Sequence, residues 1–267
     1  MVGFVSRLVI ISAENMASCR IVRRLLDLLA KDVSLVMMVP NLPVDTNNHL
    51  GRAWRLIRSA SIGFLVFKFL EIHVHHVIAW ISGATIWQQA RGHGVKIRRY
   101  RSAADDNFLT DLRNAAPEFT LSAGPAILSR TIIDLASRGT LNCHGGRLPE
   151  YQGAGTYIWM LIQGERLAYA TIQRMAYKLD AGPVLAERAI AIPPKWSAYR
   201  LDYELAEAGG QLYVDVVRQL LEGKTFQPII RHDAMQSNRG FPKQEHMRLF
   251  YATGRKLFRP VEILRLI

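Results

Sequence analysis

The sequence is poor in cysteine and lacks the short motifs that mark several common enzyme classes. Only two of its 267 residues are cysteines, Cys19 and Cys143, which is too few for a disulfide framework and typical of a reducing compartment. The first strand-to-helix turn, between Ser12 and Ser18, contains no glycine and is therefore no dinucleotide-binding fingerprint, and the chain has no P-loop motif. Oxidoreductases that use nicotinamide cofactors and P-loop NTPases are thus excluded.

Long uninterrupted hydrophobic runs are also absent. A helix that crosses a bilayer needs about 20 mostly apolar residues, and the most apolar segment, residues 50–88, is interrupted by Lys68, Glu71 and three histidines. Arginines recur at helical spacing in its first part, at positions 52, 55 and 58. The pattern predicts a helical insertion over about 46–92. Three roles stay open for it: a basic amphipathic helix on an anionic membrane surface, a helix packed on a sheet, or a homodimer interface.

The composition favours an anionic partner without a signature for nucleic acid or metal. The formal net charge is +12, which attracts nucleic acid, anionic membranes or phosphorylated substrates. No zinc-finger or RNA-binding aromatic motif is present, so nucleic acid is disfavoured. No cysteine or carboxylate pattern accompanies the histidines of the apolar segment, and a metal site is therefore not predicted at His73, His75 and His76.

Short apolar segments alternate with helical patterns along most of the chain. This alternation predicts an α/β fold with an open, mostly parallel sheet and helices on both faces. The expected strands are 8–12, 34–39, 95–100, 118–122, the segment leading to residue 142, 168–175 and 184–192. A long amphipathic helix is expected to end near residue 221. We therefore predict a catalytic domain over 1–222 and a short basic C-terminal extension over 223–267.

A candidate site lies in residues 141–155, LNCHGGRLPEYQGAG. Side chains alternate along a strand, so Asn142 and His144 are expected on one face and Cys143 on the other. Ligands of open α/β sheets bind beyond the carboxyl ends of the strands, where His144 falls. Asp180 follows 36 residues later in KLDAGPVL. An imidazole, a carboxylate that orients it and an amide donor are the groups that acyl transfer requires.

These residues and their spacing resemble the 10-formyltetrahydrofolate-dependent formyltransferases, which include the methionyl-tRNA, glycinamide-ribonucleotide and nucleotide-sugar enzymes. The pattern is an Asn-x-His segment, a Leu-Pro-x-Tyr-x-Gly turn and an Asp-x-Gly-Pro loop. The resemblance runs from about Pro117 to Leu221. The matching positions are Asn142, His144, Leu148, Pro149, Tyr151, Gly153, Asp180, Gly182 and Pro183.

The resemblance implies a Rossmann-like fold, roles for these residues and 10-formyltetrahydrofolate as formyl donor, with no metal. His144 would assist deprotonation of the attacking amine, Asn142 would donate to the formyl oxygen, and Asp180 would tune His144. The residues that the resemblance places around the folate are Gly124, Ala126, Ile127, Leu128 and Gly182. Those that it places around the acceptor are Ser12, Asn15, Tyr151, Gln152 and Gly153.

The acceptor is less well defined than the donor. Gln152 stands where the resembled family usually has arginine, on the amine side of the site. The glycine-free first turn disfavours glycinamide ribonucleotide, and the 45 residues after Glu222 are fewer than the C-terminal barrel of a transfer-RNA enzyme. We therefore predict a phosphorylated small-molecule amine, with a nucleotide-linked or lipid-linked amino sugar as the best candidate.

Two other functions remain as alternatives. The same three catalytic residue types serve hydrolysis of formyltetrahydrofolate, and a non-catalytic, membrane-associated relative would keep the fold without turnover. The apolar run at 8–12 is too short for the hydrophobic region of a signal peptide, and the acidic Glu14 follows it two residues later. The expected location is therefore the cytoplasm, including the inner face of the membrane.

Overall fold

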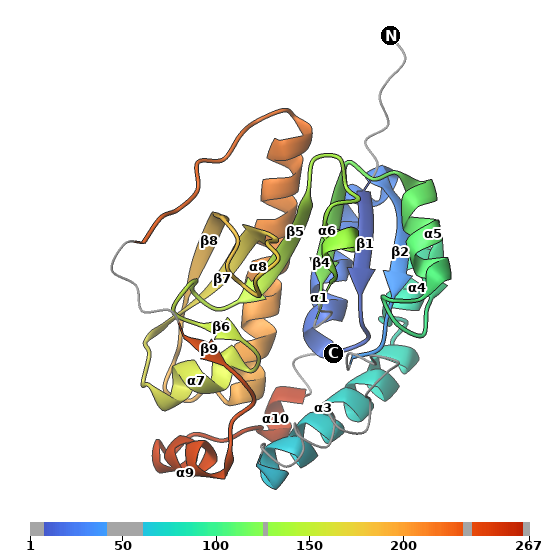
Figure 1. Ribbon diagram of the computed structural model, residues 1–267. Helices are drawn as coiled ribbons and strands as arrows, with labels where there is room; N and C mark the ends of the chain where they lie inside the picture. Colours follow the sequence, from blue (N-terminus) through green and yellow to red (C-terminus); the bar gives the residue numbers. More distant parts are fainter. Residues whose placement is uncertain (1–7, 42–60, 125–127, 232–236, 264–267) are drawn as a thin grey trace.

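A mixed seven-stranded sheet forms the centre of the computed structural model, which describes residues 8–41, 61–124, 128–231 and 237–263 (Figure 1). The strand order is β3-β2-β1-β4-β5-β7-β8. The first five strands are parallel and the last two antiparallel, which confirms the predicted α/β class. Their bounds are β1 Leu8–Ser12, β2 Val33–Met38, β3 Ile97–Arg99, β4 Phe119–Ala123, β5 Thr140–Gly145, β7 Leu167–Arg174 and β8 Val184–Ala191.

Helices cover both faces because the central strands are apolar on both sides. Alternate residues of β1 point to opposite layers: Leu8 and Ile10 join one hydrophobic cluster, and Val9 and Ile11 join another. Strands buried on both faces read as continuous apolar runs, as β1 does. The first cluster includes α1 Met16–Leu29, α4 Ile86–Gly92 and α8 Ala198–Leu221, and the other includes α5 Asp106–Ala115 and α6 Arg130–Ile133. A short 3-10 helix, Ala30–Asp32, follows α1.

α8 packs so closely on α1 and the sheet that two adjacent glycines have no room for a side chain. A Cβ at Gly209 would lie 2.7 Å from the Sγ of Cys143, and one at Gly210 would lie 3.2 Å from the Cα of Ile21. Cys143 thus faces α8, as the strand alternation predicts, on the opposite side of β5 from its neighbours in sequence. Burial raises the pKa of its thiol to about 12, so the thiol stays neutral.

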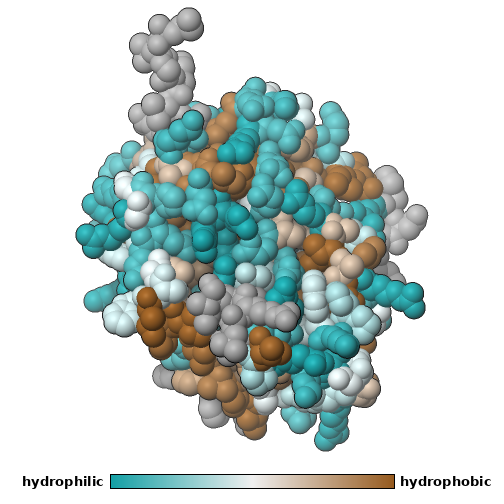
Figure 2. Space-filling model, turned by 180° about the vertical axis from the view of Figure 1, so that it is seen from behind, coloured by the Kyte–Doolittle hydropathy of each residue, from teal (hydrophilic) through white to brown (hydrophobic). Residues whose placement is uncertain are grey.

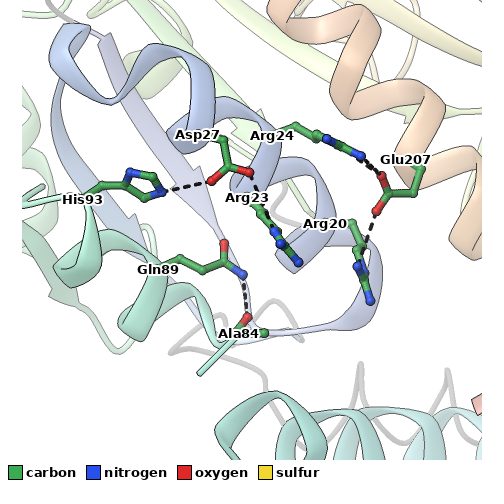
Figure 3. A network of polar contacts seen from close by, with 8 residues as sticks. All are labelled: Arg20, Arg23, Arg24, Asp27, Ala84, Gln89, His93 and Glu207. Atoms are coloured by element: carbon green, nitrogen blue, oxygen red, sulfur yellow. Dashed lines mark hydrogen bonds and ion pairs between the residues drawn. The ribbon is translucent and has the colours of Figure 1, made fainter. Parts of the chain in front are cut away.

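Ionic contacts join α1 to the elements on either side of it (Figure 3). The Arg24 guanidinium donates to Glu207 of α8 at 2.9 Å, and Nε2 of His93, just beyond α4, lies 3.0 Å from Asp27 of α1. All four groups are at least partly exposed, and such pairs contribute about 0–1 kcal/mol each. They therefore add little to the stability of the fold.

α3 Ile62–Ile81 belongs to the predicted insertion and runs across the lower end of the molecule in Figure 1. One of its faces is attached to the domain. Phe64 and Phe67 are buried, and Lys68 Nζ lies 2.5 Å from Oε2 of the buried Glu71 and over the ring of Tyr157. The predicted arginine pattern at positions 52, 55 and 58 lies outside the described residues.

The segment after α8 packs back onto the domain. β9 Asn238–Arg239 pairs in parallel with β6 Gln152–Gly153, and α9 Gln244–Ala252 contacts α7 Thr156–Ile162. The chain then reaches α10 Pro260–Ile263, where Glu262 accepts hydrogen bonds from Ser197, the N-cap of α8. The extension predicted from residue 223 therefore contributes to the same core, with Met247 and Phe250 buried.

The close approach at Gly209 generates a testable expectation. Gly209→Ala should lower the free energy of unfolding by about 1–3 kcal/mol, because the new methyl group meets Cys143. Cys143→Ala removes the sulfur atom, so it should recover part of that loss in the double variant. Denaturant unfolding of the four proteins measures the coupling. Strict additivity of the two changes would contradict the packing described.

The contact between α8 and α3 predicts a pH dependence. Burial raises the pKa of Asp202 on α8 to about 7, with Lys68 opposing the shift and Glu71 adding to it. In the unfolded chain the group ionises near pH 4. Stability is therefore lost as the pH rises from about 4 to about 7. Asp202→Asn should leave stability unchanged near pH 4 and raise it by about 1–3 kcal/mol at pH 8.

Thermal unfolding across this range measures the effect of Asp202→Asn. The matched control is Glu222→Gln just beyond α8, where the native side chain is 61% exposed. A variant with the pH profile of the native protein would show that Asp202 is ionised throughout.

Candidate active site

The candidate site lies at the carboxyl end of β5. There β5 pairs with β7, so that Asn142 stands opposite Gln173 and His144 opposite Thr171. These residues alternate with the apolar Cys143 and Ile172, which face α8. The polar side chains of two neighbouring strands therefore share one face of the sheet.

His144 is held by a backbone group. Its Nε2 lies 2.6 Å from the carbonyl oxygen of Tyr151. A carbonyl only accepts, so Nε2 carries the hydrogen and Nδ1 carries the lone pair of the neutral ring. The approach requires glycine at position 146, where a Cβ would lie 3.1 Å from Nε2 and 2.9 Å from the Tyr151 oxygen. The ring is thus oriented with Nδ1 as its basic atom.

Asp180 lies on the Nδ1 side of this ring and is itself fixed by three contacts. Its Oδ1 lies 3.7 Å from Nδ1, an ion-pair distance. Oδ1 accepts from Nε2 of Gln173 at 3.0 Å and Oδ2 accepts from the backbone N–H of Gly153 at 2.8 Å. Its backbone has φ 50°, and its carbonyl accepts from Nε2 of Gln152 at 2.9 Å. The Asp180 side chain, only 7% exposed, is thus held in place next to the ring of His144.

Asn142 differs from its neighbours because its side-chain amide makes no hydrogen bond to another described residue. The residue is half-buried at the edge of the site. Oε1 of Gln173, opposite it on β7, is buried and has no partner within the described ranges. The half-buried amide of Asn142 is therefore the group at this edge that a bound molecule can reach, while the Gln173 oxygen lies beneath it.

The side chains predicted around the acceptor have partners within the protein. Ser12 donates to the Ala123 carbonyl at 2.6 Å. Asn15 caps α1 by accepting from the Ser18 N–H at 2.9 Å, and the hydroxyl of Tyr151 donates to Glu165 at 2.6 Å. Gln152 and Gly153 hold Asp180 as described above. The structure therefore gives these residues a positioning role, and their contact with an acceptor stays a prediction.

The residues predicted around the folate lie at the ends of β4 and of the Asp180 loop. Gly124 follows β4 with φ 148°, and a Cβ there would lie 2.9 Å from Oγ of Ser18. A Cβ at Gly182 would lie 1.8 Å from the carbonyl oxygen of Arg174, so this turn also requires glycine. Leu128 is buried. Ala126 and Ile127 lie outside the described residues.

Three supporting residues were not among the predicted set. Gln173 holds Asp180, and Thr171 donates from its hydroxyl to the Gly146 carbonyl at 2.7 Å. The sequence pattern that could have identified these two residues is their spacing, since they are polar residues two positions apart within an apolar strand. Arg231 donates to the carbonyl of Leu148 at 2.8 Å and to Glu187 at 2.9 Å. No local sequence pattern predicts this role of Arg231.

With this geometry established, comparison with known proteins decides the family. The sequence profile of the formyl transferase family matches residues 27–217. This chain belongs to the formyl transferase family. The resemblance inferred from the Asn-x-His and Asp-x-Gly-Pro patterns is therefore confirmed. Within the described ranges, no group of three or more His, Cys, Asp or Glu side chains gathers as a metal site.

Individual relatives of this chain come from several branches of the family. The methionyl-tRNA formyltransferase of Anaeromyxobacter dehalogenans is 36% identical over 149 residues, which cover 55% of this chain and 47% of the relative. The chain thus spans about half the length of the curated relatives it matches. The crystal structure of phosphoribosylglycinamide formyltransferase from Anaplasma phagocytophilum has a TM-score of 0.60 at 16% identity, covering 90% of this chain and 98% of that one.

A second similar structure is the N-formyltransferase from Helicobacter canadensis in complex with folinic acid and dTDP-3-aminofucose. Its TM-score is 0.54 at 13% identity, and the match covers 87% of this chain and 70% of that one. At such identities both structural matches show the fold alone.

Because the side-chain amide of Asn142 makes no hydrogen bond to another described residue, substitutions at Asn142 and at Cys143 should affect the rate very differently. Asn142→Ala should lower formyl transfer by about 10²- to 10³-fold, the usual effect of removing one oxyanion donor, with unchanged thermal stability. Cys143→Ala is the matched control and should retain the native rate, because its side chain faces α8. A large rate loss in Cys143→Ala, or none in Asn142→Ala, would contradict the assignment of faces.

Proposed function

We propose that this chain transfers a formyl group from 10-formyltetrahydrofolate to a primary amine on a phosphorylated small molecule. The observation that carries the proposal is the oriented His144–Asp180 pair beside the free amide of Asn142, in a member of the formyl transferase family. The proposal assigns to these three residues the roles of base, orienting carboxylate and oxyanion donor.

Each of the three residues has one task in the proposed reaction. Nδ1 of His144 takes the proton that the amine loses as it attacks the formyl carbon, and it returns that proton to the folate nitrogen when the bond between this nitrogen and the formyl carbon breaks. Asp180 stabilises the resulting imidazolium across the 3.7 Å gap and keeps the ring in place. The Asn142 amide donates to the formyl oxygen, where negative charge develops.

The residues around the edge fit a folate donor, which supplies an activated formyl group when bound. Of the predicted folate residues, Gly124 and Leu128 follow the carboxyl end of β4, and Gly182 lies in the loop between β7 and β8 that also contains Asp180. Both glycine turns bring backbone close to its neighbours, and backbone groups suit recognition of a pterin ring by hydrogen bonds.

An amino sugar linked to a nucleotide or a lipid is the acceptor that we propose. Its phosphates suit a chain with a formal net charge of +12. The fold is shared with the Helicobacter canadensis enzyme, whose complex contains a nucleotide-linked amino sugar. We propose a cytoplasmic location, since Cys19 and Cys143 are both free thiols. Self-association through the predicted insertion stays a prediction.

Titration calorimetry with 5-formyltetrahydrofolate, a stable analogue of the donor, tests the first part of the proposal. One saturable site is expected, and it should be retained in His144→Ala. Absence of binding at millimolar ligand would leave a non-catalytic relative as the better description. The acceptor is then found by supplying 10-formyltetrahydrofolate with nucleotide-linked amino sugars, lipid-linked amino sugars or charged initiator transfer RNA. Release of formate without any acceptor would show the hydrolase reaction instead.

The catalytic pair predicts the size of the effect on the rate. His144→Ala and Asp180→Asn should each lower turnover by about 10²- to 10⁴-fold without loss of folding, because each removes part of the acid–base group. A stopped assay of formylated product measures the rates, with Glu222→Gln as a control remote from the site. Native turnover in either variant would overturn the mechanism.

A further inference from the structure

One face of α3 exposes apolar side chains along its whole length. Among the described residues, Ile62–Gly92 is the stretch long and apolar enough to cross a membrane, yet only 17% of its apolar window is buried. Figure 2 shows hydrophobic side chains as a brown patch along the lower left, where α3 lies. The exposed large apolar residues of the helix are Ile62, Val66, Phe69, Leu70, Val74, Val77, Trp80 and Ile81.

These residues share one face of the helix and form a stripe in which the exposed His73, packed on the ring of Phe69, is the polar member. Val66 and Val77 are 11 residues apart, close to three turns, and are 52% and 55% exposed at its centre. Twenty residues make the helix about 30 Å long. At its first turn the surface continues onto α9, because the hydroxyl of the exposed Tyr251 would lie 3.9 Å from a Cβ at Gly63. Monomers rarely expose a contiguous apolar surface of this kind.

The opposite face of α3 fixes how the helix can meet a partner. Phe64, Phe67 and Ala79 are buried against the domain, and the Lys68–Glu71 pair lies on that side. The backbone N–H of Ser61, its N-cap, donates to the Pro242 carbonyl at 3.0 Å. A helix attached along one face can lie on a surface but cannot cross a bilayer.

The charge around this stripe is strongly asymmetric. Residues 61–104 contain six lysines and arginines but only one acidic residue, Glu71. Glu71 is buried against Lys68, so the exposed face of α3 carries no negative charge. Beyond the helix the exposed basic residues are Arg91, Lys96, Arg99 and Arg101, while the charge of Arg98 is balanced by Asp111 at 2.5 Å. Two copies of this region would bring like charges together, whereas an anionic surface complements them.

We propose that the exposed face of α3 docks on an anionic lipid bilayer, with its apolar stripe in the interface and the adjacent basic residues at the headgroups. Helices of this kind bind through buried apolar area together with attraction to anionic lipids. In Figure 1, α3 lies at the lower end of the molecule, which is also where the parallel strands end. Docking therefore brings the carboxyl edge of the sheet close to the membrane.

Vesicle sedimentation tests this proposal. The intact chain should sediment with vesicles of equal phosphatidylcholine and phosphatidylglycerol, bind vesicles of phosphatidylcholine alone more weakly, and bind less at higher salt. Val66→Glu with Val77→Glu should lower the partition coefficient at least about 10-fold, because both charges enter the apolar stripe. Leu167→Glu with Ile230→Glu, two exposed apolar residues of other elements, is the matched control and should bind as the native chain does.

Thermal unfolding shows whether the variants fold, and Val66→Ser with Val77→Ser replaces the glutamate pair if that pair does not. The proposal would be overturned if the native chain did not bind anionic vesicles, or if the stripe variant bound them as tightly as the native chain does. Equal binding to both kinds of vesicle would overturn its charge requirement. A native dimer that becomes a monomer in the stripe variant, without vesicle binding, would assign the face to a second copy. The test needs neither donor nor acceptor, so its failure is separable from failure of the proposed function.

Discussion

The hydrogen bonds accepted by the Asp180 carboxylate hold the site together. They join β7, through Gln173, to the turn that contains Gly153, and they place the carboxylate beside His144. A nearly buried carboxylate without such donors would be strongly disfavoured. Hydrogen bonds to a charged group stabilise by about 1.5–3 kcal/mol each, so this one group fixes the loop and the turn relative to β5. The position of His144 relative to this carboxylate depends on that arrangement.

The turn after β5 has little regular structure, and side chains from distant segments satisfy its carbonyl groups. Thr156, Thr171, Arg231, Ser237 and His144 each donate to one of them, and they come from four parts of the chain. An irregular segment with buried carbonyls needs such donors. The carbonyls that accept are those of Gly145, Gly146, Leu148, Glu150 and Tyr151.

Local sequence patterns were sufficient to predict the strands and the face of β5 on which each side chain lies. The alternation of β5 separates Cys143 from Asn142 and His144, and the apolar runs become the strands of a largely parallel sheet. The functions of Ser12 and Asn15 could not be predicted in this way. Asn15 caps the start of α1 at Ser18, a local contact that the family resemblance did not assign to it. The hydroxyl of Ser12 bonds to the strand end at Ala123, a pairing that follows from three-dimensional packing. The return of the chain at β9 onto β6 is likewise a long-range contact without a local signal.

The orientation of His144 by the Tyr151 carbonyl has a consequence for how this scaffold can diversify. A main-chain atom holds the base, and the main-chain N–H of Gly153 holds Asp180. Replacing a side chain in this turn therefore leaves both contacts chemically intact, provided that the path of the backbone is kept. Substitutions in this turn can therefore change which acceptor the rim of the site recognises while His144 and Asp180 stay in place. Related chains can in this way keep the same reaction and use acceptors of very different size.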